Sequence, residues 1–270
     1  MLRIMDRIQG SWIVGAEDRL HTTAVPELRW VDLDQQTPEN MRPLAQRFGL
    51  HPLAVEDCLH FDQRPKLEDY TEHLFLVLHT FAAGNGEPVS VVVHEIHCFL
   101  QPQTLITVHE KRLVAVDAVW DRVIQEPELV STGLEFLLHA LCDALIDAAF
   151  PVLDRVSETI EHLEKAVLWH PKRHDLARIF HLKTQLSNLR RIVTAQRDVF
   201  SQLPRHGTLV IGASATLYFR DIYDHVLRLC EQIDLHRDLL GNVLEAYLSA
   251  TANRTNETMK HLTVLSAVFL

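Results

Sequence analysis

The sequence lacks the short motifs of the common nucleotide-binding and hydrolytic enzymes. It contains no GxGxxG dinucleotide motif, no GxxxxGK(S/T) phosphate loop and no GxSxG nucleophile motif. The stretch HEIH at residues 94–97 is one residue short of the zinc motif HExxH. It also lies in a β-like run, where two histidines cannot take the helical i, i+4 geometry. No nucleophile, base and orienting group come together in the sequence, so we do not expect an enzyme.

Cysteine, glycine and proline are all scarce. The four cysteines form no CxxC pair, which excludes a zinc ribbon and indicates a reducing compartment rather than a disulfide framework. Nine glycines and 11 prolines are too few for a fibrous or loop-dominated chain, and the 47% apolar content can fill a sizeable core. Residues 1–15 contain no long apolar run, so we expect no signal peptide.

An excess of basic residues is missing as well. Lys and Arg number 26 against 36 Asp and Glu, which gives a formal net charge of −10. A general nucleic-acid binder needs a basic face for the phosphates, so this balance argues against that class of protein. The same balance is compatible with the binding of cations.

The first part of the chain, to about residue 110, predicts a mixed α/β region. Thr37 suits an N-cap, Pro38 the first helical position and Gly49 the end, which together predict a helix to about Phe48. The sequence GNG at residues 84–86 is a hairpin signal, and the last three β-like runs are expected to form a meander. The β-like runs are residues 11–15, 28–33, 74–81, 89–100 and 104–109.

From about residue 111 onward the pattern is helical. Ser131 and Thr132 are expected to open a long helix that contains Pro151. This proline should kink the helix, because it lacks an amide donor and clashes with the preceding turn. The expected helices are residues 111–126, 131–168, 174–203 (stopped by Pro204) and 214–270.

The last of these helices, which we call the stalk helix (about residues 214–270), carries an apolar seam. Eight seam positions follow one another at alternating spacings of four and three residues, a heptad pattern typical of a helix that packs along others. The seam positions are Ile222, Val226, Leu229, Ile233, His236, Leu240, Val243 and Tyr247. A helix this long indicates a coiled coil, a repeat or a membrane span.

The stalk helix leads into the uncharged run Leu262–Leu270. A membrane span needs about 20 apolar residues, so we expect this run to be the beginning of a transmembrane helix that the chain does not complete. The alternative is a C-terminal helix docked on a core. Arg254, Lys260 and His261 precede the run and would place that side of the membrane in the cytoplasm.

Three acidic pairs are candidate ligands for a hard cation. Mg²⁺ prefers oxygen ligands and takes only one or two carboxylates from a protein. Two carboxylates one helical turn apart repel each other unless a cation lies nearby. An isolated pair is more often a solvated helix end, so none of the three is diagnostic alone. The pairs are Glu56 with Asp57, Asp143 with Asp147, and Asp221 with Asp224.

Several longer motifs together resemble the signature of the CorA family of magnesium and cobalt transporters. They occur in order and cover nearly the whole chain. The motifs are HPLAVED (51–57), QRPKLE (63–68), Tyr70, LFLVL (74–78), LCDALID (141–147), YFRDIYDH (218–225) and NRTNETMK (253–260). The Gly-Met-Asn motif that ends the first membrane helix in the family is absent from this sequence, as is a second membrane helix.

The resemblance implies a fold and an assembly. The expected fold is α/β: an N-terminal α/β/α sandwich with a mixed sheet, followed by long helices, with the stalk helix leading into a membrane span. Residues 1–128 would form a cytoplasmic α/β domain, residues 129–204 a helical hairpin packed on it, and residues 205–270 the stalk and the start of the first transmembrane helix. The resemblance also implies a homopentamer in the plasma (inner) membrane, with this portion on the cytoplasmic side.

The resemblance further implies regulatory Mg²⁺ between neighbouring cytoplasmic domains. Asp57 of one protomer would face Asp221 of the next, with Glu56 and Asp143 at a second nearby position. Bound Mg²⁺ would hold the closed state, and low Mg²⁺ would shift the population toward an open pore. The pore-facing positions implied by the family are Asn256, Met259 and Leu262, although Met259 and Leu262 also suit ordinary bundle contacts.

Two other functions stay open from the sequence. One is a zinc transporter of the same superfamily, and the other is a soluble α/β protein with a coiled-coil arm that acts as an interaction module. The residues do not rank Mg²⁺, Co²⁺, Ni²⁺ and Zn²⁺, because carboxylates accept all of them. The expected partners are other copies of the chain and membrane lipid, and no nucleic acid.

Overall fold

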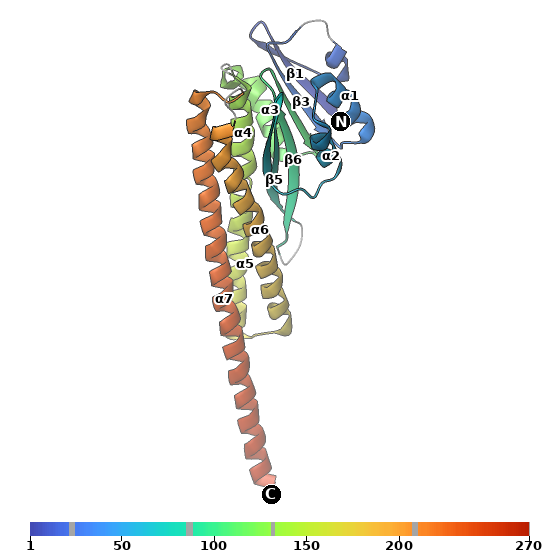
Figure 1. Ribbon diagram of the computed structural model, residues 1–270. Helices are drawn as coiled ribbons and strands as arrows, with labels where there is room; N and C mark the ends of the chain where they lie inside the picture. Colours follow the sequence, from blue (N-terminus) through green and yellow to red (C-terminus); the bar gives the residue numbers. More distant parts are fainter. Residues whose placement is uncertain (22–24, 85–88, 131–132, 207–209, 270) are drawn as a thin grey trace. The chain divides into compact units, whose positions relative to one another are not determined.

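Seven strands form one mixed sheet in the computed structural model, which describes residues 1–21, 25–84, 89–130, 133–206 and 210–269 (Figure 1). The strand order is β2-β1-β3-β7-β6-β5-β4, and β3 and β7 run parallel. The order places β5, β6 and β7 side by side, which confirms the predicted meander. The strands are β1 Leu2–Ile8, β2 Ser11–Gly15, β3 Leu28–Asp34, β4 Lys66–Tyr70, β5 His73–Ala83, β6 Val91–Leu100 and β7 Thr104–His109.

The remaining elements are helical. The α-helices are α1 Pro38–Phe48, α2 Pro52–Leu59, α3 Val114–Gln125, α4 Leu134–Asp147, α5 Phe150–Trp169, α6 Arg173–His206 and α7 Ala213–Phe269. Two short 3₁₀ helices are η1 Glu17–His21 and η2 Pro127–Val130. The residues 85–86 of the expected GNG turn, and Ser131 and Thr132, lie outside the described residues.

The ends of α1 agree with the sequence prediction. The Thr37 side chain accepts a hydrogen bond from the Asn40 amide, and the Asn40 side chain accepts one from the Thr37 amide, so the two form a capping box. Gly49 ends the helix with φ 61°, in the left-handed region that glycine tolerates best.

Helices cover both faces of the sheet, which confirms the predicted α/β/α sandwich (Figure 1). On one face, α1 and α2 close a core with β-strand residues; its members include Ile4, Val31, Met41, Leu44, Ala54, Cys58, Phe75 and Phe99. On the other face, the rings of Trp30 and Trp120 lie 4.8 Å apart and join β3 to α3. Each face of a strand therefore has its own apolar partner, as alternation along a strand requires.

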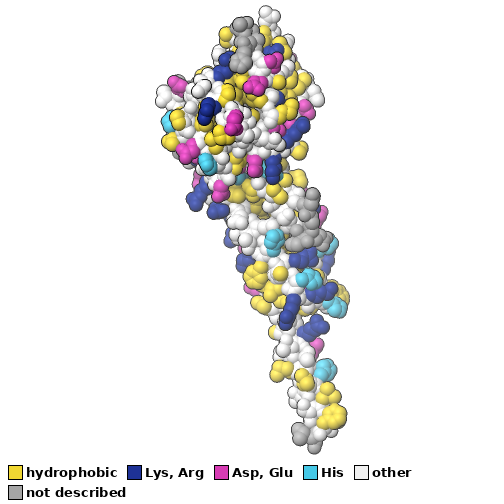
Figure 2. All heavy atoms as spheres, turned by 90° about the vertical axis from the view of Figure 1, so that its right-hand side faces the viewer, with side chains coloured by type: hydrophobic (Ala, Val, Ile, Leu, Met, Phe, Trp, Pro, Cys, Tyr) yellow, Lys and Arg dark blue, Asp and Glu magenta, His cyan; other side chains and the backbone are white. Residues whose placement is uncertain are grey.

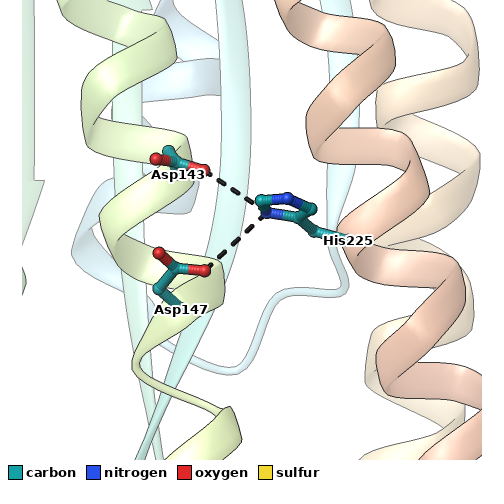
Figure 3. Close-up of side chains that lie close together, drawn as sticks. All are labelled: Asp143, Asp147 and His225. Atoms are coloured by element: carbon teal, nitrogen blue, oxygen red, sulfur yellow. Dashed lines mark ion pairs between the residues drawn. The ribbon is translucent and has the colours of Figure 1, made fainter.

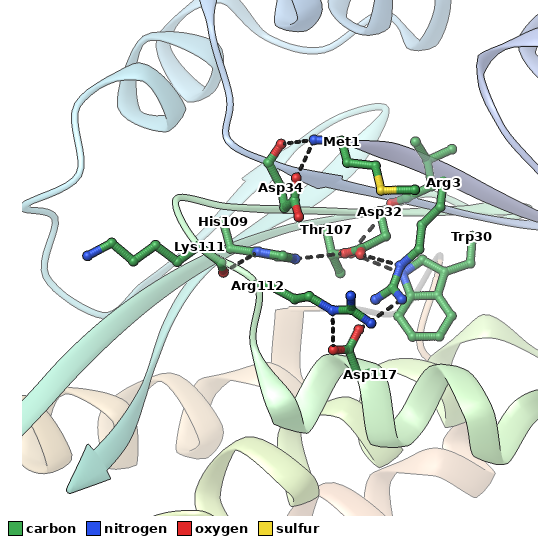
Figure 4. A network of polar contacts seen from close by, with 11 residues as sticks. Met1, Arg3, Trp30, Asp32, Asp34, Thr107, His109, Lys111, Arg112 and Asp117 are labelled. Atoms are coloured by element: carbon green, nitrogen blue, oxygen red, sulfur yellow. Dashed lines mark hydrogen bonds and ion pairs between the residues drawn. The ribbon is translucent and has the colours of Figure 1, made fainter. Parts of the chain in front are cut away.

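A buried polar network lies beside the carboxyl ends of β3 and β7 (Figure 4). Asp32 accepts hydrogen bonds from Thr107, from His109 Nε2 at 3.0 Å and from Arg3 Nε at 2.7 Å. Arg3 also pairs with Asp117 of α3 at 2.9 Å. Burial alone would raise the pKa of Asp32, but the bonds from His109 and Thr107 and the charge of Arg3 hold it below its ordinary value. The network ties β1, β3 and β7 to α3.

Two strands were not predicted from the sequence. In β1 the charged Asp6 interrupts the apolar pattern, yet it is buried because Arg29 and Arg19 pair with it at 2.7 and 3.2 Å. In β4 the sequence KLEDY has a single apolar aliphatic residue, and the strand forms because it pairs with β5 along the edge of the sheet. Tertiary pairing decides both strands, not local propensity.

Prolines affect two helices differently. The predicted kink at Pro151 is a break: α4 ends at Asp147, and Pro151 is the second residue of α5, where its missing amide removes no helical hydrogen bond. The predicted stop at Pro204 is wrong, because α6 continues to His206.

The chain divides into two compact units. The first unit comprises Met1–Ala82, Val92–Phe150 and Ile192–Leu229, and it contains the sheet. The second comprises Ala83–Val91, Pro151–Arg191 and Cys230–Leu270, and it is built from stretches of α5, α6 and α7. In the second unit, Arg190 of α6 holds Asp234 of α7 at 2.8 and 3.0 Å. The boundaries predicted after residues 128 and 204 stay a prediction.

The heptad seam of the stalk helix is confirmed along α7. All eight seam residues, from Ile222 to Tyr247, are at most 7% exposed. Beyond the seam, residues 251–269 are all exposed. Exposed apolar side chains of this segment, at the foot of Figure 2, are Met259, Leu262, Val264, Leu265, Val268 and Phe269. Four hydroxyls there bond backward to the carbonyl oxygen four residues earlier, namely those of Thr255, Thr258, Thr263 and Ser266.

Among the described residues, one helical stretch has the length and apolarity of a membrane span. It is Leu134–Trp169, which contains an 18-residue window with a mean hydropathy of 1.7, and 56% of that window is buried. Such burial is typical of core helices, and α4 contributes eight buried residues, from Leu134 to Ile146.

Candidate metal centre

Two acidic side chains of α4 point toward one histidine of α7 in the first unit (Figure 3), and a carboxylate of α7 lies near the same histidine. Asp143 and Asp147 lie one turn apart on α4, and Asp221 and His225 lie one turn apart on α7. The apolar stripes of both helices face inward, with Leu141 and Leu145 on α4 and Ile222 and Val226 on α7 buried. This packing leaves the four polar side chains together at the edge of the helix pair.

The distances show three carboxylates around a single imidazole. His225 Nδ1 lies 3.4 Å from Asp143 Oδ1 and 3.7 Å from Asp147 Oδ1. His225 Nε2 lies 3.6 Å from Asp221 Oδ2. Asp143, Asp147 and His225 each place one potential ligand atom within 4.8 Å of the others. We call Asp143, Asp147, Asp221 and His225 the α4–α7 cluster.

Two atoms of the α4–α7 cluster are buried without a hydrogen bond. Among the described residues, Asp143 Oδ1 and His225 Nδ1 have no hydrogen-bond partner and no contact with solvent. A buried polar atom without a partner costs free energy, so each such atom needs an explanation. A bound cation is one, because it satisfies an oxygen and a nitrogen lone pair at once.

The electrostatics of the α4–α7 cluster favour a cation. Burial and the neighbouring Asp143 carboxylate raise the pKa of Asp147 above its ordinary value, against the opposing effect of His225. One turn earlier on α4, the His139 ring meets the Tyr218 ring of α7 at 5.3 Å, and burial lowers the pKa of His139. This contact holds the two helices together above the carboxylates.

The donor set fits a divalent cation. Metal–ligand distances of about 2.1 Å place neighbouring ligands about 3 Å apart and opposite ligands about 4.2 Å apart. The observed separations of 3.4 and 3.7 Å between His225 and the two α4 carboxylates need only small side-chain shifts to reach these values. Oxygen ligands suit Mg²⁺, and the imidazole nitrogen adds a ligand that Co²⁺, Ni²⁺ and Zn²⁺ accept readily.

The second predicted acidic pair lies on α2. His51 Nδ1 caps this helix by accepting a hydrogen bond from the Leu53 amide. Glu56 is exposed, and Asp57 is partly buried. Asp57 already has a counter-ion, because Lys66 Nζ donates to its Oδ2 at 2.6 Å.

Lys66 is held by two carboxylates on one side of β4. Its Nζ donates to Glu68 Oε1 at 2.9 Å in addition to Asp57. Burial alone would lower the pKa of Lys66, but the bonds to Asp57 and Glu68 outweigh it and raise the pKa above its ordinary value. Tyr70 donates to Glu68 Oε2 at 2.7 Å, and burial together with this bond raises the pKa of Tyr70 to about 12.

The structure thus brings together only some of the predicted residues. Asp143 and Asp221 meet at the same imidazole. Glu56 and Asp57 do not join them in one chain, because α2 and α4 cover opposite faces of the sheet (Figure 1). Asp224, the sequence partner of Asp221, is exposed.

His225 was not among the predicted ligands. Its position four residues after Asp221 was the available signal, because residues at i, i+4 share a helix face. Asp147 was noted as a partner of Asp143 but was not selected as a ligand. Sequence spacing alone did not reveal that α4 and α7 lie side by side at this level.

The predicted pore residues lie on the exposed end of α7. Asn256 is exposed, and Met259 and Leu262 are 60% and 58% exposed. Their spacing of three residues keeps them on one side of the helix. Their role in a pore stays a prediction.

A second imidazole–carboxylate cluster is buried on β5 and β6. The two oxygens of Glu95 face His79 Nε2 at 3.7 Å and His97 Nε2 at hydrogen-bond distance. The Gln63 amide also donates to Glu95 at 3.0 Å. We call His79, Glu95 and His97 the β5–β6 cluster. As predicted for the HEIH sequence, Glu95 and His97 are strand residues.

Comparison with known proteins gives a consistent result. The family model for CorA-like Mg²⁺ transporter proteins matches residues 26–270. The cobalt/magnesium transport protein CorA of Thermotoga maritima is 34% identical over 230 residues, which cover 83% of this chain and 64% of that protein. The putative metal ion transporter YfjQ of Bacillus subtilis is 28% identical over 247 residues, which cover 91% of this chain and 76% of that protein. The chain therefore spans slightly less than two thirds of the Thermotoga relative.

Solved structures share the fold. The CorA magnesium transporter from Methanocaldococcus jannaschii superposes with a TM-score of 0.86 at 18% identity, over 100% of this chain and 83% of that chain. The ZntB cytoplasmic domain from Vibrio parahaemolyticus gives a TM-score of 0.70 at 16% identity, over 94% of this chain and 98% of that chain. At these identities the likeness concerns the fold alone.

Proposed function

The chain belongs to the CorA family of Mg²⁺ transporters, and on that premise we propose that it is the cytoplasmic, cation-sensing part of a divalent-cation transporter. Mg²⁺ is the proposed cargo and regulator, with Co²⁺ and Ni²⁺ as further cargo. Because the chain belongs to this family, we do not propose an unrelated soluble interaction module.

The observation that carries the proposal is the α4–α7 cluster. Three carboxylates share one imidazole, and the facing atoms Asp143 Oδ1 and His225 Nδ1 are buried without a hydrogen bond among the described residues. A divalent cation relieves the repulsion between the carboxylates and supplies the missing partner. We propose that Asp147 and His225 act with Asp143 and Asp221.

The proposed assembly is a homopentamer in which cation sites lie between neighbours. Asp57 of one protomer faces Asp221 of the next, with Glu56 and Asp143 close by. The separation of α2 and α4 on opposite faces of the sheet supports this, because a second copy is needed to bring the two acidic sets together (Figure 1). Empty interfaces repel, and bound Mg²⁺ favours the closed ring, so falling Mg²⁺ opens the pore.

The pore is proposed to begin on the exposed end of α7. Asn256 would hold a hydrated cation, and Met259 and Leu262 would form apolar rings that gate by excluding water. The exposure of these side chains in a single chain supports the proposal, because a pore lining contacts other copies and the permeating ion. Arg254, Lys260 and His261 favour the cytoplasmic side for the preceding residues.

One observation favours zinc as an alternative cargo. His225 supplies a nitrogen ligand among the carboxylates, and imidazole suits Zn²⁺ better than Mg²⁺.

The test is thermal unfolding of the chain in increasing MgCl₂, with NaCl of matched ionic strength and with light scattering for the oligomeric state. A cation that binds only the folded protein stabilises it by about 2.7 kcal/mol at 100-fold excess over Kd. We expect stabilisation at millimolar Mg²⁺ together with a shift to pentamers. The same series in ZnCl₂ examines the alternative cargo.

Paired variants sharpen the test. Asp221→Asn should remove most of the Mg²⁺ response, whereas Asp224→Asn, on the same helix, should leave it unchanged. Pentamers without any Mg²⁺ response, or equal losses in the two variants, would contradict the proposed sensing site. Transport itself is measured as Mg²⁺ uptake into proteoliposomes that contain the transporter of which this chain is part.

A further inference from the structure

We propose that Lys66 is a tethered competitor of the divalent cation at Asp57, so that it sets the concentration at which this site fills. The inference rests on the proposed function, in which Asp57 is a regulatory ligand. It adds a residue that does not bind the cation and a second carboxylate, Glu68, that receives the displaced ammonium group.

The geometry gives one ammonium group two carboxylates. Lys66 Nζ lies 2.6 Å from Asp57 Oδ2 and 2.9 Å from Glu68 Oε1. The side chains of Lys66 and Asp57 are only 29% and 21% exposed, so solvent screens the pair incompletely. The ammonium also lies 5.6 Å from the centre of the Phe75 ring, whose face attracts a cation. A cation that approaches Asp57 therefore meets a positive charge already in contact with its ligand.

The second carboxylate is fixed in position by the strand. Lys66, Glu68 and Tyr70 alternate along β4 and so share one face. The Tyr70 hydroxyl donates to the other oxygen of Glu68 at 2.7 Å. The Tyr70 ring stacks on His51 at 4.2 Å, and His51 is the N-cap of α2, the helix that carries Asp57. Glu68 is thus a prepared acceptor for Lys66.

These contacts predict an exchange. In the absence of a divalent cation, Lys66 bridges Asp57 and Glu68. When a cation binds Asp57, the ammonium group stays on Glu68, a few ångströms from the ion. The repulsion between a divalent and a monovalent cation at that separation weakens binding by about tenfold even in a water-like dielectric, which corresponds to about 1.4 kcal/mol. The site then responds at higher cation concentrations than Asp57 alone would.

Two substitutions should shift the Mg²⁺ midpoint in opposite directions. Lys66→Gln removes the competitor and should lower the midpoint of Mg²⁺-dependent thermal stabilisation of the assembled chain by about tenfold. Glu68→Gln removes the alternative acceptor, holds Lys66 on Asp57 and should raise the midpoint several-fold. Lys66→Arg keeps the charge and should leave the midpoint within about twofold.

Controls separate this exchange from a general charge effect. Asp69→Asn removes an exposed carboxylate from the other face of β4, and Lys183→Gln removes an exposed ammonium from α6; both should leave the midpoint unchanged. In the double variant Lys66→Gln/Glu68→Gln, the effect of Glu68→Gln should largely vanish, because Glu68 acts through Lys66.

The outcomes are distinct. If the wild-type chain responds to Mg²⁺ and Lys66→Gln leaves the midpoint unchanged, the inference is overturned and the proposed function stands. Should Lys66→Gln not fold, Glu68→Gln decides: a raised midpoint supports the exchange, and an unchanged or lowered one overturns it. A wild-type assembly with no Mg²⁺ response removes the proposed function and the inference together.

Discussion

Among the described residues, the α4–α7 cluster and the β5–β6 cluster combine imidazole and carboxylate groups in inverted proportion. In the α4–α7 cluster three carboxylates share one histidine, and the side chains of Asp147 and Asp221 are 57% and 65% exposed. In the β5–β6 cluster two histidines share one carboxylate, and the side chains of His79 and Glu95 are both 7% exposed. The same two functional groups therefore occur in a solvent-accessible acidic site and in a closed site.

The comparison shows how burial and the ratio of carboxylates to imidazoles separate a structural cluster from a candidate binding site. The single carboxylate of the β5–β6 cluster lies between two imidazoles and accepts a hydrogen bond from the Gln63 amide, so its partners all belong to the fold. Three carboxylates around one imidazole leave negative charge unmatched at an accessible edge, and this is the reason that we propose a cation at the α4–α7 cluster. Substitutions and low pH should therefore affect stability mainly through the β5–β6 cluster, and divalent cations should act mainly through the α4–α7 cluster.

Removal of the β5–β6 carboxylate should have the largest effect. Glu95→Ala leaves the Gln63 amide and His97 Nε2 without their acceptor in a buried site. We expect a loss of about 3 kcal/mol in the free energy of unfolding, measured by urea denaturation. Asp147→Ala is the matched change in the α4–α7 cluster and should alter the free energy of unfolding by less than about 0.5 kcal/mol. Equal losses of unfolding free energy in the two variants would contradict the proposed difference between the clusters.

Low pH should destabilise the protein through the β5–β6 cluster. Burial lowers the pKa of His79 from 6.5 to about 4, with Glu95 and Asp62 opposing the shift and His97 adding to it. Since the folded-state pKa is depressed, the unfolded chain binds more protons between these values. The contribution to stability is complete above pH 6.5 and falls as pH decreases toward 4, by up to about 3 kcal/mol.

The pH test compares a buried and an exposed histidine. His79→Gln should flatten the dependence of the free energy of unfolding on pH between 6.5 and 4. His261→Gln, on the exposed end of α7, should leave the dependence unchanged. An unaltered slope in His79→Gln would assign the acid sensitivity to other groups.

The next largest effect is expected on the metal preference of the α4–α7 cluster. His225→Gln replaces the nitrogen ligand with an amide, so we expect Co²⁺ binding to weaken about tenfold and Mg²⁺ binding to change less than about threefold. Isothermal titration calorimetry with the two ions measures both values. His79→Gln serves as the control, because His79 is a buried histidine outside the α4–α7 cluster. A loss of Mg²⁺ affinity as large as that of Co²⁺ would show that His225 acts through the fold.

The smallest effect is expected from Asp147→Asn. The pKa of Asp147 is raised, so its ionised form opposes folding, and this cost is present above the folded-state pKa and relieved as pH falls toward the ordinary value of 3.8. Without divalent cations at pH 7, the variant should be slightly more stable than the wild type. Excess Mg²⁺ should reverse the order, and thermal unfolding in both conditions checks the reversal.

The sequence predicted elements whose signals are local. The Thr37 N-cap, the Gly49 C-cap and the heptad positions of α7 depend on neighbours within one helix, and each has the expected place. β1 was missed because Asp6 needs Arg29, 23 residues away, to be buried. His225 was missed for a similar reason: two of its three carboxylate partners, Asp143 and Asp147, lie on another helix.

The hydroxyl groups on the exposed end of α7 have a consequence for solvation. An unsatisfied hydroxyl that leaves water costs roughly 1–3 kcal/mol. Thr255, Thr258, Thr263 and Ser266 each already donate to a carbonyl oxygen of their own helix. These hydroxyl groups can therefore leave water and still keep a hydrogen-bond acceptor. Transfer of the last turns of α7 from water into an apolar medium would therefore cost less free energy than their content of Thr and Ser suggests.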